Sequence, residues 1–151
     1  MKLSPTDKII QDKMKAGVLT ADGFLGSDRR NFRDIIAEDM KVVNTFERSL
    51  ADIANRMQYL MEKSFLSYDG SIVVDKNYEV EYTSYRGVLL SPFPQAGRFG
   101  KATIKVTNLK NHMSVVWTPL HVHFIRDYGF FEGKGSKFRI EPEMLYKTIF
   151  D

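Results

Sequence analysis

Two histidines separated by a single residue are the first place to look for chemistry. His121 and His123 lie in the stretch Thr118-Pro-Leu-His-Val-His-Phe-Ile-Arg-Asp-Tyr-Gly129. In a strand, residues two apart face the same way, so both rings could reach one metal ion. Candidate third ligands are His112, Asp127 and Glu132. In a helix the two rings lie about 200° apart and form no joint site.

The residues around the pair favour a helix. Thr118 is a suitable N-cap, and the proline after it is favoured at the first helical position. Apolar residues then recur at helical spacing, and Gly129 follows where a left-handed C-cap residue is common. We therefore expect a helix over residues 118–128, no metal bound by the pair, one histidine at the core edge and one in solvent. Because His, Val, Phe and Ile are mediocre helix formers, a strand with a metal site remains the alternative.

Three helices are expected before residue 68. The proline after Ser4 predicts the start of the first helix, and Gly17 predicts its end. Ser27 or Asp28 can cap a second helix, which ends near Asn44. Helical periodicity supports both helices, and the apolar positions are Ile9, Ile10 and Met14 in the first and Phe32, Ile35, Ile36, Met40 and Val43 in the second.

A third helix begins at Ser49, which together with Asp52 resembles a capping box. Its apolar stripe is Leu50, Ile53, Met57, Leu60 and Met61. The helix is expected to fray near Ser67. A fourth helical pattern begins near residue 142, where a proline again stands at a helix start.

Between these helices the period changes to two, which is typical of strands. Alternating segments cover residues 72–83, 101–107 and 113–117. The last two are separated by an expected turn at residues 109–112, and a proline- and glycine-containing loop covers residues 92–100. The order of helices, strands and helix without β-α-β alternation predicts an α+β fold with an antiparallel sheet of three to five strands. We expect one domain over residues 1–151, helical at 1–68 and mainly sheet with closing helices at 70–151.

The composition limits the classes of protein that need to be considered. The chain has 151 residues, of which 43% are hydrophobic and 27% charged, as is ordinary for a globular protein. Cysteine is absent, which excludes disulfides, thiolate metal sites and a cysteine nucleophile. No signal-peptide core or membrane-spanning run is found. We therefore expect a cytoplasmic protein with no membrane partner, and no residue pattern predicts a cofactor.

The distribution of charge is the most informative feature of the sequence. Residues 1–75 carry 11 basic and 12 acidic side chains, whereas residues 76–139 carry 10 basic and 4 acidic ones, a net charge of +6. No acidic residue occurs from Tyr82 to Arg126. A basic surface with stackable aromatic rings is what a nucleic acid or a phosphate-bearing ligand needs. Ordinary cross-strand pairs of lysines with Glu79 and Glu81 are the alternative explanation.

Basic residues beside flexible glycine-containing loops are the best candidates for contacts with an anion. They are Arg98, Lys101, Lys134, Lys137, Arg139 and, more weakly placed, Arg86. The segment Glu132-Gly-Lys-Gly-Ser-Lys137 could form an anion-binding nest of backbone N–H groups, or simply the turn of a hairpin. It lacks P-loop spacing, which excludes nucleotide hydrolysis of that kind. No catalytic residue is assigned, since the chain has no Gly-x-Ser-x-Gly elbow and Ser136 has no evident partner.

One segment resembles known sequences. Gly129-Phe-Phe-Glu-Gly-Lys-Gly-Ser-Lys-Phe-Arg-Ile-Glu-Pro142 is similar to a stretch found in uncharacterised bacterial proteins of this size. The resemblance covers about a tenth of the chain. It implies a bacterial setting and carries no activity, ligand or fold.

Three classes of function follow. The first is a non-catalytic binding module for an anionic partner, which basic residues clustered on one face would favour. The second is a small enzyme, which a concave pocket joining His123, Glu132 and Arg139 would favour. The third is a structural or interaction component, such as a homo-oligomer, which a large exposed apolar patch would favour.

Overall fold

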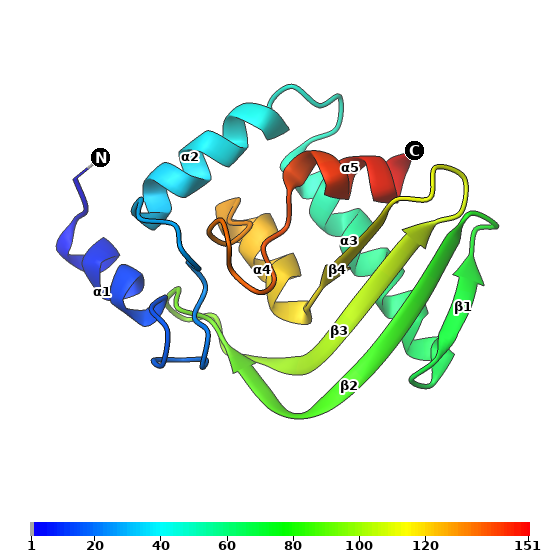
Figure 1. Ribbon diagram of the computed structural model, residues 1–151, viewed down its shortest axis with the longest axis horizontal. Helices are drawn as coiled ribbons and strands as arrows, with labels where there is room; N and C mark the ends of the chain where they lie inside the picture. Colours follow the sequence, from blue (N-terminus) through cyan, green and yellow to red (C-terminus); the bar gives the residue numbers. More distant parts are fainter. Residues whose placement is uncertain (1) are drawn as a thin grey trace.

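The chain forms a curved antiparallel sheet that is covered by helices (Figure 1). The computed structural model describes residues 2–151. The helices are α1 (Pro5–Lys13), α2 (Phe32–Val43), α3 (Leu50–Ser64), the short 3-10 helix η1 (Phe65–Ser67), α4 (Pro119–Tyr128) and α5 (Pro142–Phe150). The strands are β1 (Ser71–Val74), β2 (Tyr78–Leu90), β3 (Arg98–Asn108) and β4 (Ser114–Trp117). This confirms the predicted α+β fold, with antiparallel pairing throughout and a C-terminal helix.

The sheet is a simple meander in the order β1-β2-β3-β4. Its long central hairpin, β2 with β3, changes register between Ser84 and Val88, where Gly87 takes a φ of 103° that favours glycine. Beyond this bulge the hairpin bends toward α1 (Figure 1). The hairpin is longer than the sequence predicted, because the apolar and polar alternation fades where both faces become exposed.

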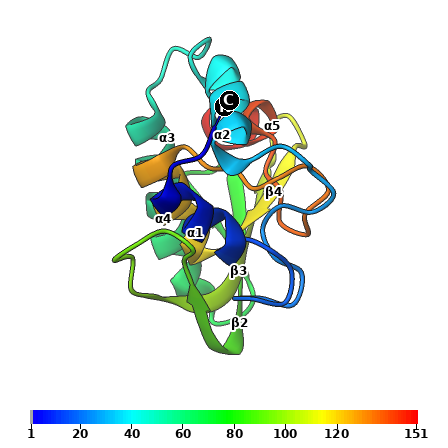
Figure 2. The ribbon, with the colours of Figure 1, turned by 90° about the vertical axis from the view of Figure 1, so that its left-hand side faces the viewer.

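Two apolar clusters hold the elements together. The larger one joins the buried face of the sheet to α3 and α5, with Trp117 and Ile104 fully buried. The smaller one is rich in phenylalanine and joins α1, the start of α2 and α4 to residues that follow β2. In Figure 2, α3 and α4 lie on the left, and the α1–α2 loop (blue) lies beside the loop after α4 (orange) on the right, where backbone hydrogen bonds join the two loops. These two loops form one wall of the site described below.

The predicted helix starts are confirmed in two of the three N-terminal helices. Ser4 accepts a hydrogen bond from the Asp7 N–H, and Ser49 with Asp52 forms a complete capping box. The predicted cap of the second helix is wrong. Asn31 caps α2, and Asp28 instead binds the backbone and guanidinium of Arg30.

Three other expectations need correction. The period-two run over residues 72–83 is broken between β1 and β2, where Asp75 and Lys76 adopt left-handed conformations in a tight turn. Ile9 was expected on the apolar face of α1 but is 58% exposed. Residues 130–139 form no strands and hence no β-hairpin: their loop is closed by a hydrogen bond from the Ile140 N–H to the Phe131 carbonyl and packs against the α1–α2 loop. Among the described residues, no helix has the length and apolar character needed to cross a bilayer.

Candidate functional site

The two histidines lie on α4, as the helical pattern predicted, and their rings have different partners. His121 bonds with Thr118 and Glu132, whereas His123 bonds with Ser91 and Asp127. Within residues 2–151, no group of three or more histidine, aspartate and glutamate side chains is placed to hold a metal ion. The helical arrangement therefore replaces the shared histidine site with two separate histidine–carboxylate pairs.

The first pair is buried, and its hydrogen bonds define the proton positions. The Thr118 N–H donates to His121 Nδ1 over 2.9 Å, and the Thr118 hydroxyl lies 3.0 Å from the same nitrogen. A ring nitrogen that accepts a hydrogen bond carries no proton, so the proton of the neutral ring is on Nε2. Nε2 consequently donates to Glu132 Oε2, which it contacts directly. Both nitrogens of His121 are therefore engaged within the protein.

Glu132 is brought to His121 by the loop that follows α4. Its other carboxylate oxygen accepts a hydrogen bond of 3.0 Å from the Ser136 hydroxyl. Gly133 donates to the Phe24 carbonyl, and a Cβ at Gly133 would lie only 2.2 Å from the Leu25 carbonyl oxygen. The glycines of this loop thus allow close packing of two backbones.

The same packing counts against an anion-binding nest in residues 132–137. The N–H groups of Gly133 and Ser136 bond to backbone carbonyls, and that of Lys134 donates to the Asp28 carboxylate over 3.1 Å. Hydrogen bonding to the Arg30 side chain lowers the pKa of Asp28 well below its ordinary value, so this carboxylate is an internal anion at neutral pH. The position that a ligand phosphate would need is occupied by a side chain of the protein.

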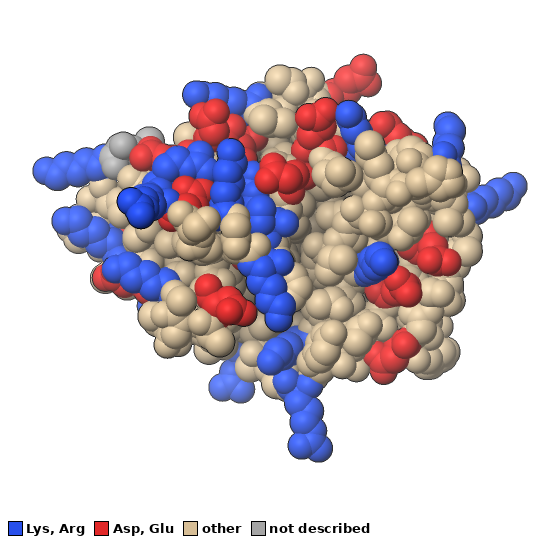
Figure 3. Space-filling view, viewed as in Figure 1, with Lys and Arg blue, Asp and Glu red and all other residues tan. Residues whose placement is uncertain are grey.

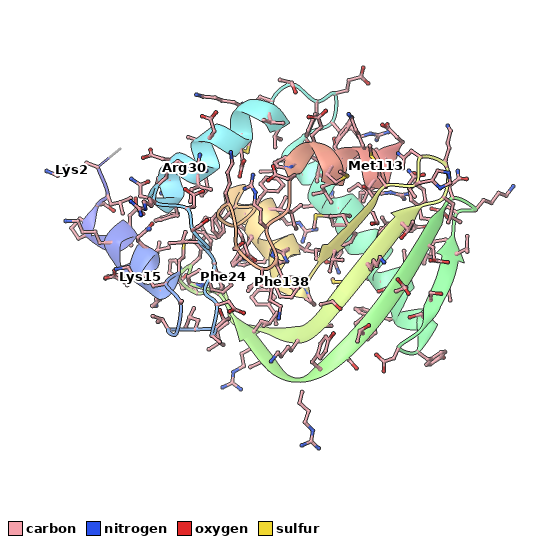
Figure 4. All side chains as sticks on the ribbon, viewed as in Figure 1. Lys2, Lys15, Phe24, Arg30, Met113 and Phe138 are labelled. Carbon is pink, nitrogen blue, oxygen red and sulfur yellow. The ribbon has the colours of Figure 1, made fainter. Side chains whose placement is uncertain are left out.

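A cavity of about 450 Å³ lies over the buried pair. It is bounded by the 19–24 loop, the bent part of the β2–β3 hairpin, the beginning of α4 and residues of the 132–138 loop. Its apolar wall consists of Leu19, Phe24, Val88, Leu89, Leu120 and Phe138, and its polar lining includes Thr118, His121, Glu132, Asp22, Lys101 and Lys137. Figure 4 shows the labelled Phe24 and Phe138 close together on this face of the molecule.

The structure separates the six predicted anion-binding residues into three groups. Lys101 and Lys137 line the cavity, although they lie far apart in the sequence. Arg86, Arg98 and Lys134 are exposed and lie outside the cavity lining. Their role in binding stays a prediction. In Figure 3, Lys and Arg side chains form a band down the middle of this face toward the bend of β2 and β3.

Arg139 belongs to a different environment. Its guanidinium is only 7% exposed and forms two hydrogen bonds with Asp39, of 2.5 and 2.9 Å, and others with Glu141 and the Glu132 carbonyl. Burial lowers the pKa of Arg139, but the hydrogen bonds with Asp39 and Glu141 outweigh burial and raise it above its ordinary value. Arg139 therefore fastens α2 to the 132–141 loop, and its donors are committed to the protein.

The second histidine pair includes a residue that the sequence did not single out. The Ser91 hydroxyl lies 3.1 Å from His123 Nε2, and Asp127 Oδ2 lies 2.9 Å from His123 Nδ1. The expectation of one solvated histidine is wrong, because the His123 side chain is 11% exposed and stacks on Phe99. The spacing of His123 and Asp127 on a helix predicts their contact. Nothing local predicts Ser91, which the end of β2 brings to the helix.

Two of the basic residues on the central strands have different surroundings. Glu81 lies opposite Lys105 in the sheet register, as the alternative explanation of the lysines proposed, whereas Lys101 faces the cavity. A pocket joining His123, Glu132 and Arg139 was expected for an enzyme. The cavity found here contains Glu132, but with His121 and Lys137 in place of His123 and Arg139.

Comparison of the chain with protein-family models, curated proteins and solved structures finds no match. The resemblance of residues 129–142 to bacterial proteins stays a prediction.

Proposed function

We propose that this protein is a binding module for a small anionic ligand that carries an apolar group, held in the cavity above His121. The observation that carries the proposal is the convergence of Lys101 and Lys137 on one cavity with an apolar wall. Both lysines come from the basic part of the chain, residues 76–139. They would hold the anion, and the wall would hold the apolar group.

The size and lining of the cavity suit a small molecule. Ligand sites commonly have volumes of about 300–1,000 Å³ with mostly apolar walls and a few fixed polar groups. A cavity of about 450 Å³ lies within that range. The fixed polar groups here are Thr118, His121 and Glu132, which their mutual hydrogen bonds hold in place.

The charges around the cavity select an anion of low charge. Among the described residues, neither Lys101 nor Lys137 has a carboxylate within 4.0 Å, so both ammonium groups are available to a ligand. Asp22 and Glu132 also line the cavity and would repel the additional negative charges of a polyphosphate. A carboxylate, a sulfonate or a phosphate monoester fits these charges better than a polyphosphate does.

A small ligand is favoured over a single-stranded nucleic acid because most aromatic rings of the basic region are not exposed. Trp117 and Phe93 are buried, and Tyr82 packs edge-on against Phe65. Tyr85, at 53% exposure, is available for stacking. Proteins that bind single strands need several exposed rings on which successive bases stack.

The cavity is proposed as a binding site without catalysis. An acid or base that acts on a ligand needs a nitrogen or oxygen within hydrogen-bond reach of the reacting proton. Both nitrogens of His121 are already bonded, one to the Thr118 backbone and one to Glu132. The buried pair therefore shapes the floor of the cavity.

A fluorescent aromatic sulfonate, 8-anilinonaphthalene-1-sulfonate, tests the proposal directly. It combines one negative charge with an apolar body, and its emission rises in apolar surroundings. We expect saturable binding with one site per chain, weakening as salt is added. Reversing the charge of both lysines, Lys101→Glu with Lys137→Glu, should weaken binding by about tenfold or more, the equivalent of about 1.4 kcal/mol. Phenyl phosphate and benzoate should compete with the probe.

The matched control is the double variant Lys105→Glu with Lys110→Glu. It makes the same change in net charge within the same basic region but away from the cavity lining. We expect its affinity to stay within about twofold of the original, since distant surface charges are screened by salt. Equal weakening in both double variants would contradict the proposal, and so would displacement of the probe by oligonucleotides but not by phenyl phosphate.

A further inference from the structure

We propose that Ser91, His123 and Asp127 form a second, independent site, in which Ser91 is a nucleophile toward activated acyl and phosphonyl groups. The three side chains come from the end of β2 and from α4. They lie outside the lining of the cavity proposed for anion binding. The inference thus adds an activity to the molecule and does not depend on a ligand in the cavity.

The order of contacts is the one that nucleophile activation requires. A hydroxyl, an imidazole and a carboxylate must be joined in sequence, with the base between the nucleophile and the orienting group. Here Ser91 Oγ lies 3.1 Å from His123 Nε2, and His123 Nδ1 lies 2.9 Å from Asp127 Oδ2. Both distances lie within the range of about 2.6–3.2 Å expected for a nucleophile and its base.

The carboxylate fixes the tautomer of the ring. An ionised carboxylate only accepts hydrogen bonds, so His123 Nδ1 is the donor toward Asp127. In the neutral ring Nε2 is then an acceptor, and it receives the Ser91 hydroxyl proton. The Phe93 N–H donates to Ser91 Oγ over 3.1 Å and leaves the hydroxyl hydrogen free to point at the ring.

Aromatic side chains hold the imidazole in this position. Phe99 stacks on the His123 ring, with centroids 5.0 Å apart and an interplanar angle of 27°. Tyr128 and Phe93 contact the ring edge-on, at 5.7 and 6.4 Å. A ring confined in this way needs little reorganisation when it receives a proton. Ser91 itself is half-buried and directly follows β2.

The proposed reaction is acyl transfer to water in two steps. Ser91 Oγ attacks the carbonyl carbon of an ester, and its proton passes to His123 Nε2. The C–O bond to the leaving alcohol breaks, and His123 returns the proton to the alcohol. Water then attacks the acyl-serine, giving one proton to His123, and the acid departs as Ser91 regains that proton. Asp127 keeps its charge throughout and stabilises the protonated ring.

The other serines with bonded hydroxyls differ in the group that they face. The hydroxyl of Ser136 donates to the Glu132 carboxylate, and that of Ser84 lies against Asp69. Ser64 donates to the Met61 carbonyl. Among these described hydrogen bonds, Ser91 is the serine whose hydroxyl is joined to an imidazole that a carboxylate orients.

A fluorophosphonate probe with a fluorescent tag tests the proposal, because such probes phosphonylate activated serines and displace fluoride. We expect labelling of the folded protein at Ser91, located by peptide mass spectrometry. Ser91→Ala should abolish the label. His123→Gln should slow labelling by about 100-fold or more, in line with the usual contribution of a general base. The folded protein should also release p-nitrophenol from p-nitrophenyl acetate, with loss of this release in Ser91→Ala.

Ser136→Ala is the matched control. It removes a serine hydroxyl that is bonded directly to a carboxylate and has no imidazole as its own partner, so the rate of labelling at Ser91 should not change. Circular dichroism verifies that each variant is folded. The proposal is overturned if the folded protein is not labelled at Ser91, or if His123→Gln is labelled as fast as the original protein. Asp127→Asn gives a further test, because a residue that positions the ring should slow labelling without changing the labelled site.

Discussion

His121 and His123 lie two residues apart on α4, and the fold pairs each of them with a carboxylate in a different way. His121 and Glu132 are 2% and 4% exposed, and each ring nitrogen of His121 is bonded within the protein. The His123 side chain is 11% exposed and that of Asp127 is 52% exposed, so the second pair reaches the surface only through its carboxylate. Chemical identity alone therefore does not decide the role of a histidine. The groups that occupy its two nitrogens, and their burial, decide it.

The two pairs also differ in what joins them to the rest of the chain. Glu132 is held by the 132–138 loop, which packs tightly on the α1–α2 loop through Gly133. Asp127 is on the same helix as His123, so this pair lies within α4. The contact between His123 and Ser91 connects the pair to the end of β2. The first pair therefore ties several segments together, whereas the second joins α4 to the end of one strand.

The largest expected effect is a difference in the free energy of unfolding between two single variants, His121→Ala and His123→Ala. His121→Ala leaves the buried Glu132 carboxylate without its ring donor and should reduce the free energy of unfolding by about 3–4 kcal/mol. His123→Ala removes a mostly buried ring, but its carboxylate partner is half exposed and stays solvated, so the loss should be smaller, about 1–2 kcal/mol. Urea unfolding measures both. Similar losses for the two variants would break the distinction between a structural and a surface pair.

A second prediction concerns the loop that carries Glu132. A Cβ at Gly133 would lie 2.2 Å from the Leu25 carbonyl oxygen, so Gly133→Ala must separate the two loops and should cost about 2–3 kcal/mol. Gly100→Ala is the control, since no atom lies within 4 Å of its added Cβ and its backbone is not in the left-handed region. We expect the control to stay within about 0.5 kcal/mol. Thermal unfolding of the two variants tests whether close loop packing positions the buried pair.

A third prediction uses pH to test the same loop. The Asp28 carboxylate binds the Lys134 N–H and has a lowered pKa because of its hydrogen bonds with Arg30. A lowered pKa gives stability that is present above the pKa of the unfolded state, about 4, and lost as pH falls through the lower folded value. Asp28→Asn should therefore destabilise by about 1–2 kcal/mol at pH 7.

The pH dependence of that difference is the decisive measurement. Urea unfolding of the original protein and of Asp28→Asn should give curves that approach each other as pH is lowered from 7 to 3. A constant difference over this range would show that the Asp28 charge is not what supports the 132–138 loop. Glu38→Gln provides the control, because Glu38 pairs with Lys41 on the exposed face of α2.

The smallest expected effect on stability is that of Asp127→Asn. Exposed charged pairs spaced four apart on a helix contribute about 0.3–0.5 kcal/mol, so unfolding should hardly change. The phosphonylation rate of Ser91 should nevertheless fall, since the asparagine no longer stabilises the protonated ring. A large loss of stability with an unchanged rate would make the second pair structural, like the first.

The helix starts and the helical stripes can be read from residues that lie close together in the chain. Ser4 and Ser49 predicted helix starts, and the stripe after Pro119 predicted a helix in α4 that separates the two histidine rings. These signals succeed because caps and helical periodicity depend on residues within a few positions of each other. The acid-free run from Tyr82 to Arg126 likewise indicated where basic residues would gather.

Contacts between residues far apart in the chain depend on long-range packing. Lys101 and Lys137 share a cavity because β3 and the loop after α4 both border it, and Arg139 is withdrawn from the surface by Asp39 of α2. Ser91 reaches His123 because the β2–β3 hairpin is longer than its alternation suggests and bends toward the helix. Such contacts depend on strand length, bulge position and loop packing, which arise from interactions across the whole chain and leave no local pattern in the residues that they bring together.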